Sequence, residues 1–317
     1  MPRIEIGLAT YNSAKFLRAQ LDSLFSQTCQ DFDLLVADDG SSDATLAILA
    51  EYKARFPHRI RLLAFDTPAG GACANFARIT DAFTADYAMY CDHDDVWLPD
   101  KIELSMKRMR TAERRCGHAV PILVHTGLSV CGSDLSPYGF SYETYTNLDQ
   151  SHASANRLLV QNVVAGCAAL MNRALYELAR PIPREATMHD HWVALVASLS
   201  GVIEFERQPT LLYRQHGGNA VGARSWSIQS VMQRAREILT TQRSASFLKC
   251  INQAALLLAR ENLELTLPQR RLLSAFRDLP SQSRLARLLT IRREGIVMDG
   301  ALRNLGLIVS AALLPLP

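Results

Sequence analysis

The chain has 317 residues, 48% of them apolar and 21% charged, and its formal net charge is +3. This length and apolar content are enough for the core of one large α/β domain with a smaller appendage, and they exclude a chain that stays unfolded. The charge is uneven, because residues 1–226 carry 21 basic and 25 acidic side chains and the remainder carries 13 and 6. The basic part suits an anionic partner such as a phospholipid surface, and a solvated arginine-rich helix face explains it equally well. Because no nucleic-acid-binding motif is present, nucleic acid is not an expected partner.

The seven cysteines stand singly, without a CxxC pair or a zinc-ligand spacing, and are interpreted as reduced, mostly buried thiols. The N-terminal sequence offers no apolar signal segment, and no apolar run reaches the roughly 20 residues of a membrane span. The nearest candidate, Leu305 to Pro317, suits at most an interfacial position. These features predict a cytoplasmic enzyme, with peripheral contact at the inner face of the cytoplasmic membrane as a hypothesis for the basic part.

Short apolar runs alternate with amphipathic stretches over residues 1–100, which is typical of βαβ units that build a mainly parallel sheet. After a fifth apolar run the pattern becomes mixed, and beyond Trp226 it is nearly all helical. We therefore predict an α/β domain over residues 1–225 and a helical region over residues 226–317. The expected strands are Ile4–Ala9, Leu34–Ala37, Ile60–Phe65, Tyr87–Cys91 and Ile122–Val130.

Polar segments follow three of the expected strands. Thr10-Tyr11-Asn12 follows the first strand, Asp38 to Asp43 follows the second, and Asp92 to Asp95 follows the fourth. In open α/β sheets the ligand binds beyond the carboxyl ends of the strands. We therefore expect the three segments to meet at one edge of the sheet.

Three carboxylates, Asp92, Asp94 and Asp95, fall within four residues at a strand end. Such a cluster repels itself unless a cation or strong donors compensate. Mg²⁺ or Mn²⁺ prefers oxygen ligands and keeps positions open for phosphate oxygens, so the cluster is a candidate site for a metal-diphosphate complex. An acidic turn that caps the following helix is the alternative on this segment alone.

The second acidic loop, Asp38 to Asp43, is largely explained by helix capping and a tight turn at Gly40. Capping does not require the acidic pair Asp38 and Asp39 directly at the strand end, where a carboxylate could accept hydrogen bonds from a base or ribose. Tyr11, in the loop after the first strand, could stack on a base.

Two later segments are also candidates. Met188 to Trp192 places two imidazoles around Asp190 at a helix start, where the carboxylate could cap the helix or act as a general base toward a sugar hydroxyl. Tyr213 to Asn219 is interpreted as a glycine-containing loop that folds over a diphosphate, with Arg214 or His216 supplying charge or a metal ligand. A purely structural role for His216 is the alternative. Asn162 to Cys167 is predicted to be a buried strand in which Gly166 allows close approach.

Taken together, these segments resemble glycosyltransferase family 2, which has the GT-A fold, and the resemblance covers roughly residues 3–220. It is nearest to a bacterial rhamnosyltransferase-like subgroup with Asp-Asp-Val/Ile-Trp and Tyr-Arg-Gln-His-Gly segments. The order of the motifs is more specific than any one of them. The matching motifs are Ala9-Thr10-Tyr11-Asn12, Val36-Ala37-Asp38-Asp39-Gly40-Ser41, Cys91 to Trp97, Gly166-Cys167, His189-Asp190 and Tyr213-Arg214-Gln215-His216.

The resemblance implies a Rossmann-like, mainly parallel GT-A sheet with a helical C-terminal extension. It also implies that Thr10, Tyr11 and Asp38 hold the nucleotide of a nucleotide-sugar donor, with Asp39 as a further helper. Asp92 would contact the ribose or the metal.

For the reaction, the resemblance implies that Asp94 binds the Mg²⁺ or Mn²⁺ that bridges the diphosphate, with Asp92 and His216 as further metal ligands. Asp190 would remove the acceptor proton in a single displacement with inversion, as in an inverting hexosyltransferase. The expected donor is dTDP-rhamnose, and the expected acceptor is a cell-surface glycan or a lipid-linked oligosaccharide.

Two departures from the family pattern leave the donor sugar open: His189 stands where an acidic residue is usual, and Asp66 to Gly71 lacks the common Asn-Gly arrangement. A nucleotidyltransferase and a catalytically silent binding scaffold are the rival functions. A nucleotidyltransferase would need a glycine-rich, basic phosphate loop after the first strand, and none is present there. A catalytically silent sugar-nucleotide or glycan-binding scaffold is disfavoured because all the carboxylates, including Asp190, are retained.

Overall fold

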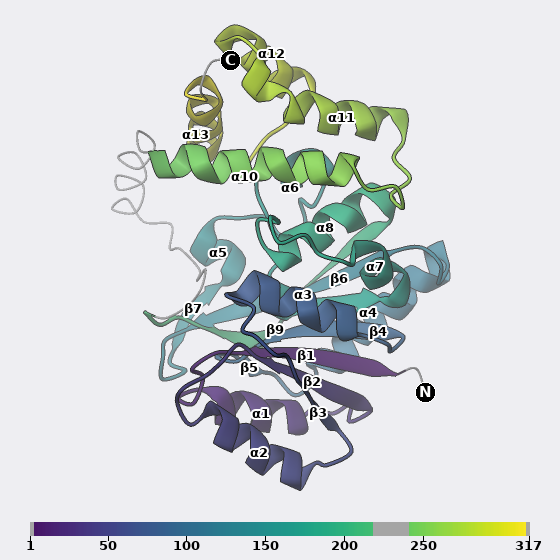
Figure 1. Cartoon of the computed structure of the whole chain (residues 1–317), viewed down its shortest axis with the longest axis vertical. Helices are drawn as coiled ribbons and strands as arrows, with labels where there is room; N and C mark the ends of the chain where they lie inside the picture. Colours follow the sequence, from purple (N-terminus) through teal and green to yellow (C-terminus); the bar gives the residue numbers. More distant parts are fainter. Residues whose placement is uncertain (1–2, 218–240, 315–317) are drawn as a thin grey trace.

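The computed structural model describes residues 3–217 and 241–314, apart from the side chains of residues 241–245. A mixed sheet crosses the middle of the molecule, helices cover both of its faces, and the C-terminal helices stack at one end (Figure 1). The predicted division between residues 225 and 226 lies outside the described residues and stays a prediction.

The sheet contains nine strands within the described residues, in the order β3-β2-β1-β4-β8-β6-β9-β5, with β7 paired to β6. The first four strands are parallel, and β8 joins them to the parallel pair β6 and β9 by antiparallel pairing on both sides. The strands are β1 (Ile4–Thr10), β2 (Phe32–Asp38), β3 (Ile60–Leu63), β4 (Tyr87–Asp92), β5 (Val96–Trp97), β6 (Ile122–Cys131), β7 (Pro137–Ser141), β8 (Ala169–Asn172) and β9 (Val202–Arg214).

Alternation of side chains along the strands builds two cores, one on each face of the sheet. In β2, Leu34 and Val36 pack on the face covered by α1, α2 and α4, and Leu35 and Ala37 pack on the face covered by α3, α7 and α8. The covering helices are α1 (Leu17–Phe25), α2 (Thr45–Arg55), α3 (Ala72–Ala82), α4 (Lys101–Cys116), α7 (Arg173–Ala179) and α8 (His189–Ser200).

The five strands expected from the sequence are confirmed, the third of them ending earlier, at Leu63. The strand expected over Asn162 to Cys167 is wrong, because extended loop backbone there leads into a short 3-10 helix, η1 (Gly166–Ala168). The Asn162 side chain bonds both the N–H and the carbonyl of Val164, and the Gly166 N–H donates to Asp190. Side chains therefore satisfy the backbone groups that a strand would use for its ladder.

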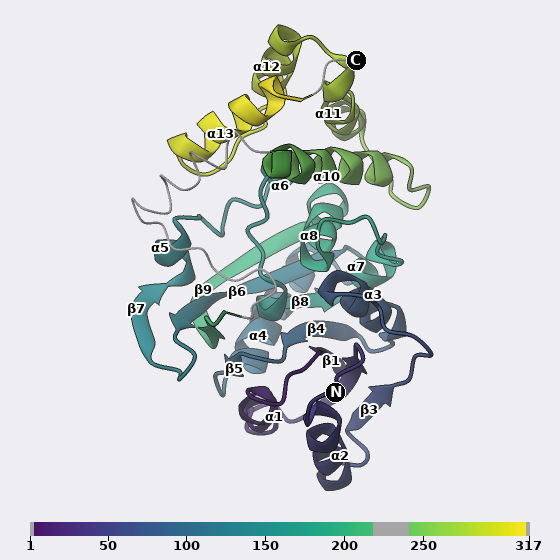
Figure 2. The same cartoon turned by 60° about the vertical axis from the view of Figure 1, so that its left-hand side comes forward.

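The C-terminal helices extend the core on the α8 side rather than forming a separate layer, as both views show (Figures 1 and 2). Phe247 and Ile251 of α10 belong to the same apolar cluster as Trp192 of α8. The elements of this region are α10 (Thr241–Leu258), α11 (Leu267–Arg277), η2 (Leu279–Ser281), α12 (Arg284–Arg293) and α13 (Ala301–Ala312). No helix among the described residues is long and apolar enough to cross a bilayer.

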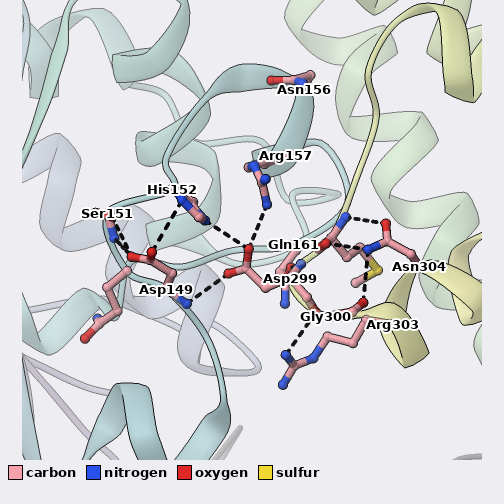
Figure 3. A network of polar contacts seen from close by, with 12 residues as sticks. Asp149, Ser151, His152, Asn156, Arg157, Gln161, Asp299, Gly300, Arg303 and Asn304 are labelled. Carbon is pink, nitrogen blue, oxygen red and sulfur yellow. Dashed lines mark hydrogen bonds and ion pairs between the residues drawn. The ribbon is translucent and has the colours of Figure 1, made fainter.

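A polar network ties the start of α13 to the loop between α5 (Tyr142–Thr146) and α6 (Ala155–Leu158), as Figure 3 shows. Asp299 accepts from the Arg157 guanidinium at 2.7 Å and from the Asp149 N–H at 2.9 Å, and it contacts His152 Nδ1 at 3.2 Å. The helical extension is therefore fixed to the sheet domain by polar as well as apolar contacts.

Candidate active site

Strand register brings the three polar segments to one edge of the sheet, as expected from the sequence. Thr10 pairs with Asp38 across β1 and β2, and Ala9 pairs with Asp92 across β1 and β4. The ends of these three parallel strands are thus level, and the loops that follow them share one side of the sheet.

The carboxylate of Asp38 is held by its own loop. Its Oδ2 accepts from Thr10 Oγ1 at 2.8 Å and from Ser41 Oγ at 2.6 Å, and its Oδ1 accepts from the N–H groups of Gly40 and Ser41. Gly40 has a φ of 87°, which favours glycine. Beside this loop the Tyr11 side chain is 57% exposed, so its ring is available for stacking on a planar ligand.

Asp39 points the other way, toward the loop before α3. Its carboxylate accepts from the N–H groups of Ala69, Gly70 and Gly71, the last at 2.9 Å. Both oxygens are occupied and the side chain is buried. Asp39 therefore positions the small-residue segment that leads into α3, next to the predicted nucleotide site.

The loop after β4 is built differently, because its carboxylates face one another. Atoms of Asp92, Asp95 and Cys167 lie within 4.8 Å of one another. Burial, then Asp94 and Asp190, raise the pKa of Asp92 to about 7. Burial, then Asp94 and Asp92, raise the pKa of Asp95 well above its usual range. Close, poorly solvated carboxylates of this kind favour a proton or a cation between them.

Asp94 of this loop is paired with His216, which follows β9. Asp94 Oδ2 lies 2.8 Å from His216 Nε2, and the two side chains are 11% and 14% exposed. Arg214 holds the loop in place, because its Nε donates to the Asp94 carbonyl at 2.5 Å and its backbone N–H donates to Asp95 Oδ1 at 3.1 Å. The guanidinium also lies 4.6 Å from the Phe16 ring centroid. The strand end at β9 therefore positions the acidic loop.

Asp190 stands in the first turn of α8, and its contact with Gly166 places it next to Cys167 of the acidic cluster. Its Oδ1 accepts from Asn162 Nδ2 at 3.1 Å and from the His191 N–H at 2.6 Å, and its Oδ2 accepts from the Gly166 N–H at 3.0 Å. Burial raises the pKa of Asp190 to about 6, and the Gly166 and His191 N–H groups limit the rise. The carboxylate is thus oriented by three donors and can bind a proton near neutral pH.

His189, at the position where the sequence resemblance implies an acidic residue, is an aromatic packing residue in this fold. Its ring stacks on Phe76 at 4.0 Å and meets Tyr90 edge-on at 4.7 Å. Burial lowers its pKa to about 3, so the imidazole is neutral. A methyl group on Gly166 would lie 2.8 Å from His189 Nε2 and 3.4 Å from Asp190 Oδ2, so only glycine fits beside this pair.

Two sets of groups fit a divalent cation to different degrees. The set of Asp92, Asp95 and Cys167 offers two carboxylates, and Asp95 Oδ2 has no hydrogen-bond partner among the described residues. In that set Asp95 and Cys167 are buried, and a thiol is a poor ligand for a hard cation. The side chains of Asp94 and His216 are 11% and 14% exposed, and with the half-buried Asp92 they fit an ion that must also meet a diphosphate.

A buried lysine side chain, that of Lys101, is also part of this region. Lys101 is fully buried, and its Nζ lies 3.4 Å from Thr210 Oγ1 and 4.6 Å from the Trp97 ring centroid. Burial lowers the pKa of Lys101 to about 8, against the opposing effect of Cys167, Cys91 and Asp95. One such ammonium offsets only part of the negative charge of the loop.

Sequence reasoning missed several of these contributors. It assigned no role to Asn162 or Lys101, and it treated Asp95 only as one member of the acidic cluster. The available signals were the glycine in the segment Asn162 to Cys167 and the match of Gly166-Cys167 to a family motif, and neither indicated a role for Asn162. The remainder of the loop predicted to cover a diphosphate, at residues 218 and 219, lies outside the described residues.

Known proteins with similar sequences and structures identify the family of this chain. The dTDP-rhamnosyl transferase RfbG of Shigella flexneri is 28% identical over 228 residues, which are 68% of this chain and 74% of that protein. Staphylococcus aureus TarS residues 1–349, solved with UDP-GlcNAc, align with a TM-score of 0.54 at 15% identity over 98% of this chain and 91% of that chain. The mannosyltransferase PcManGT of Pyrobaculum calidifontis, solved with GDP-Man and Mn²⁺, aligns with a TM-score of 0.54 at 15% identity. The alignment covers 98% of this chain and 79% of that chain.

These structures share the GT-A fold with this chain, which confirms the expected fold class. The sequence profile described as Glycosyl transferase family 2 matches residues 5–178, which is more than half of the chain. Enzymes of this family transfer a sugar from a nucleotide-sugar donor with inversion. The chain therefore belongs to glycosyltransferase family 2 and is an inverting glycosyltransferase.

Proposed function

We propose that the enzyme transfers rhamnose from dTDP-rhamnose to a hydroxyl of a bacterial cell-surface glycan or lipid-linked oligosaccharide, with Mg²⁺ or Mn²⁺ as cofactor and Asp190 as the base. The observation that carries the reaction is that two consecutive residues connect Asp190 with the acidic loop. The Gly166 N–H donates to Asp190 Oδ2 at 3.0 Å, and the Cys167 thiol lies within 4.8 Å of carboxylate oxygens of Asp92 and Asp95.

On the donor side, Thr10, Tyr11 and Asp38 bind the nucleotide. Asp38 is held rigid by four hydrogen bonds from its own loop and from Thr10, and the exposed Tyr11 ring lies directly after β1. Asp39 assists by holding the loop at residues 69–71 in place. A rigid carboxylate beside an exposed ring suits recognition of a planar base.

Asp94 and His216 hold the metal, with Asp92 beside them contacting the ribose or the ion. This assignment rests on the 2.8 Å contact between Asp94 and His216 and on their partial exposure. When bound, a divalent cation offsets the charge that develops on the leaving nucleotide diphosphate. Arg214 supports the assignment because it fixes the backbone of Asp94 and Asp95.

Asp190 accepts the proton of the acceptor hydroxyl while the acceptor oxygen forms its bond to the anomeric carbon and the bond from that carbon to the diphosphate oxygen breaks. The donors Asn162, Gly166 and His191 orient the carboxylate and favour its ionised form. Attack opposite the leaving group gives inversion. General-base assistance of this kind contributes about 10² to 10⁴ in rate.

The donor is proposed from RfbG, whose name specifies dTDP-rhamnose chemistry at 28% identity. The test is to incubate the purified full chain, with Mn²⁺ or Mg²⁺, with dTDP-, UDP- and GDP-sugars and a mixed glycan acceptor extract, and to measure nucleotide diphosphate release. Release from dTDP-rhamnose that stops with chelator and resumes with added metal is the expected result. Release from a UDP- or GDP-sugar alone would contradict the proposed donor, and release that is indifferent to chelator would contradict the metal.

A further inference from the structure

Helix α13 presents an apolar face to solvent. The positions that lie together on its outer side at 3.6 residues per turn are all apolar, and Leu302, Leu305 and Ile308 among them are 46%, 53% and 44% exposed. The full outer face consists of Ala301, Leu302, Leu305, Ile308, Val309, Ala312 and the following residue Leu313. This arrangement is unlike that of a helix on a water-facing surface.

The inner side of α13 carries the polar and small residues of the helix. Gly306 and Ser310 are buried, and Ser310 Oγ donates to the Gly306 carbonyl. Arg303, the one charged residue of the helix, donates inward to the carbonyls of Thr146 and Asn147. Leu307 and Ala311 are buried on the same inner side, so α13 has apolar side chains on both of its sides and directs Ser310 and Arg303 inward. Contact with water alone would not favour this arrangement.

The neighbouring helices are strongly basic. Residues 267–314 contain eight arginines and three acidic residues. Helix α12 packs against α13, and its exposed side alternates leucine with arginine. That side consists of Arg284, Leu285, Leu289, Arg292 and Arg293. Apolar side chains bordered by arginines are the composition expected of a surface that inserts among anionic lipid headgroups.

We propose that α13, with α12 beside it, docks the enzyme on the surface of an anionic phospholipid bilayer. The outer face of α13 is one helix wide, whereas a stable protein interface needs about 800 Å² and 20 to 30 residues from each partner. Interfacial insertion has no such threshold, because its strength grows with the apolar area that enters the boundary of the acyl chains. The excess of arginines favours an anionic surface over a neutral one.

Docking by α13 places the bilayer near the proposed base. The Asp299 N–H, just before α13, donates to Gln161 Oε1 at 2.7 Å, and the next residue, Asn162, donates to Asp190 (Figure 3 shows the first of these contacts). An acceptor anchored in the bilayer would thus reach the site from the side on which α13 lies. This consequence rests on the lipid-linked acceptor of the proposed function, whereas bilayer binding itself does not.

The test is co-sedimentation of the full chain with vesicles of phosphatidylglycerol and phosphatidylcholine, or of phosphatidylcholine alone, over a range of NaCl concentrations. We expect binding to the anionic vesicles that weakens with salt. The variant Leu305→Glu/Ile308→Glu should bind at least about tenfold more weakly, since each lost leucine-sized insertion changes affinity by roughly that factor. The control is Leu46→Glu, because Leu46 is 52% exposed on α2 at the far end of the molecule.

Thermal unfolding of each variant shows whether the substitutions leave the fold intact. Equal binding of wild type and Leu305→Glu/Ile308→Glu, or no binding of wild type to anionic vesicles, would overturn the proposal. So would a wild-type dimer in light scattering that the same double variant converts to a monomer, because a second copy would then be the occupant of this face. Transfer to a water-soluble acceptor tests the proposed function separately from lipid binding.

Discussion

Two acidic loops follow β2 and β4, the parallel strands on either side of β1, and their carboxylates are held in opposite ways. In the loop after β2, hydrogen-bond donors from the loop itself, from Thr10 and from residues 69–71 occupy the oxygens of Asp38 and Asp39. In the loop after β4, burial and mutual repulsion raise the pKa values of Asp92 and Asp95. Hydrogen bonds therefore fix the conformation of the first loop. In the second loop the carboxylates repel one another, and a bound cation or proton would reduce that repulsion.

The contrast shows that the spacing of carboxylates in a sequence does not distinguish carboxylates that have hydrogen-bond donors from carboxylates that mainly repel one another. Both loops have adjacent aspartates close to the end of a parallel strand, although the first leads into α2 and the second into the short strand β5. What separates them is the number of donors that the fold delivers to each carboxylate, and several of those donors, Thr10 and residues 69–71, are distant in sequence. The following predictions test this contrast, beginning with the largest effect.

Removal of the proposed base, which faces the loop after β4, should have the largest effect. Asp190→Asn keeps the size of the side chain but cannot accept the hydroxyl proton, so kcat should fall by about 10³ while the donor KM changes little. Initial rates with saturating donor and metal measure the loss. Asp31→Asn, at an exposed position, is the matched control. Near-normal kcat in Asp190→Asn would remove Asp190 from the mechanism.

The two candidate metal sets can be separated by neighbouring substitutions within the loop after β4. Asp94→Asn should raise the Mn²⁺ concentration needed for half-maximal activity by about 10- to 100-fold, because it removes a charged ligand. Asp95→Asn should change that concentration by only a few-fold, since Asp95 faces the buried side of the loop. Metal titrations of activity and of Mn²⁺ binding decide between the sets. The opposite ranking would place the ion among Asp92, Asp95 and Cys167.

The pH dependence should follow the raised pKa of Asp190. A base acts only when deprotonated, so at saturating metal kcat should fall about tenfold per pH unit below a pH near 6. Asn162→Leu removes a donor that favours the ionised carboxylate, and it should move this acid limb to higher pH. A purely structural role for Asn162 would lower the rate equally at every pH.

The parts of this site that lie at the ends of neighbouring strands were predictable from the sequence. Thr10, Asp38 and Asp92 each end an apolar run, and parallel strands bring such ends to one edge. Asp190 lies about a hundred residues further on, so only the resemblance to a family connected it with them. Lys101 and Asn162 were not predictable, because their roles depend on tertiary burial and on a loop whose backbone bonds to side chains instead of a strand.

The smallest predicted effect is a change in the free energy of unfolding, and it compares the two loops directly. Asp39→Asn replaces one acceptor oxygen by a donor that faces backbone N–H groups, so the free energy of unfolding should fall by about 1 to 2 kcal/mol. Asp95→Asn should leave it unchanged or raise it by up to about 1 kcal/mol at pH 7. The amide retains an acceptor for the Arg214 N–H and removes a charge that burial and two neighbouring carboxylates oppose. Urea unfolding of both variants without metal measures the difference. If Asp95→Asn were the more destabilising of the two, the loop after β4 would be held by its own hydrogen bonds, as the loop after β2 is.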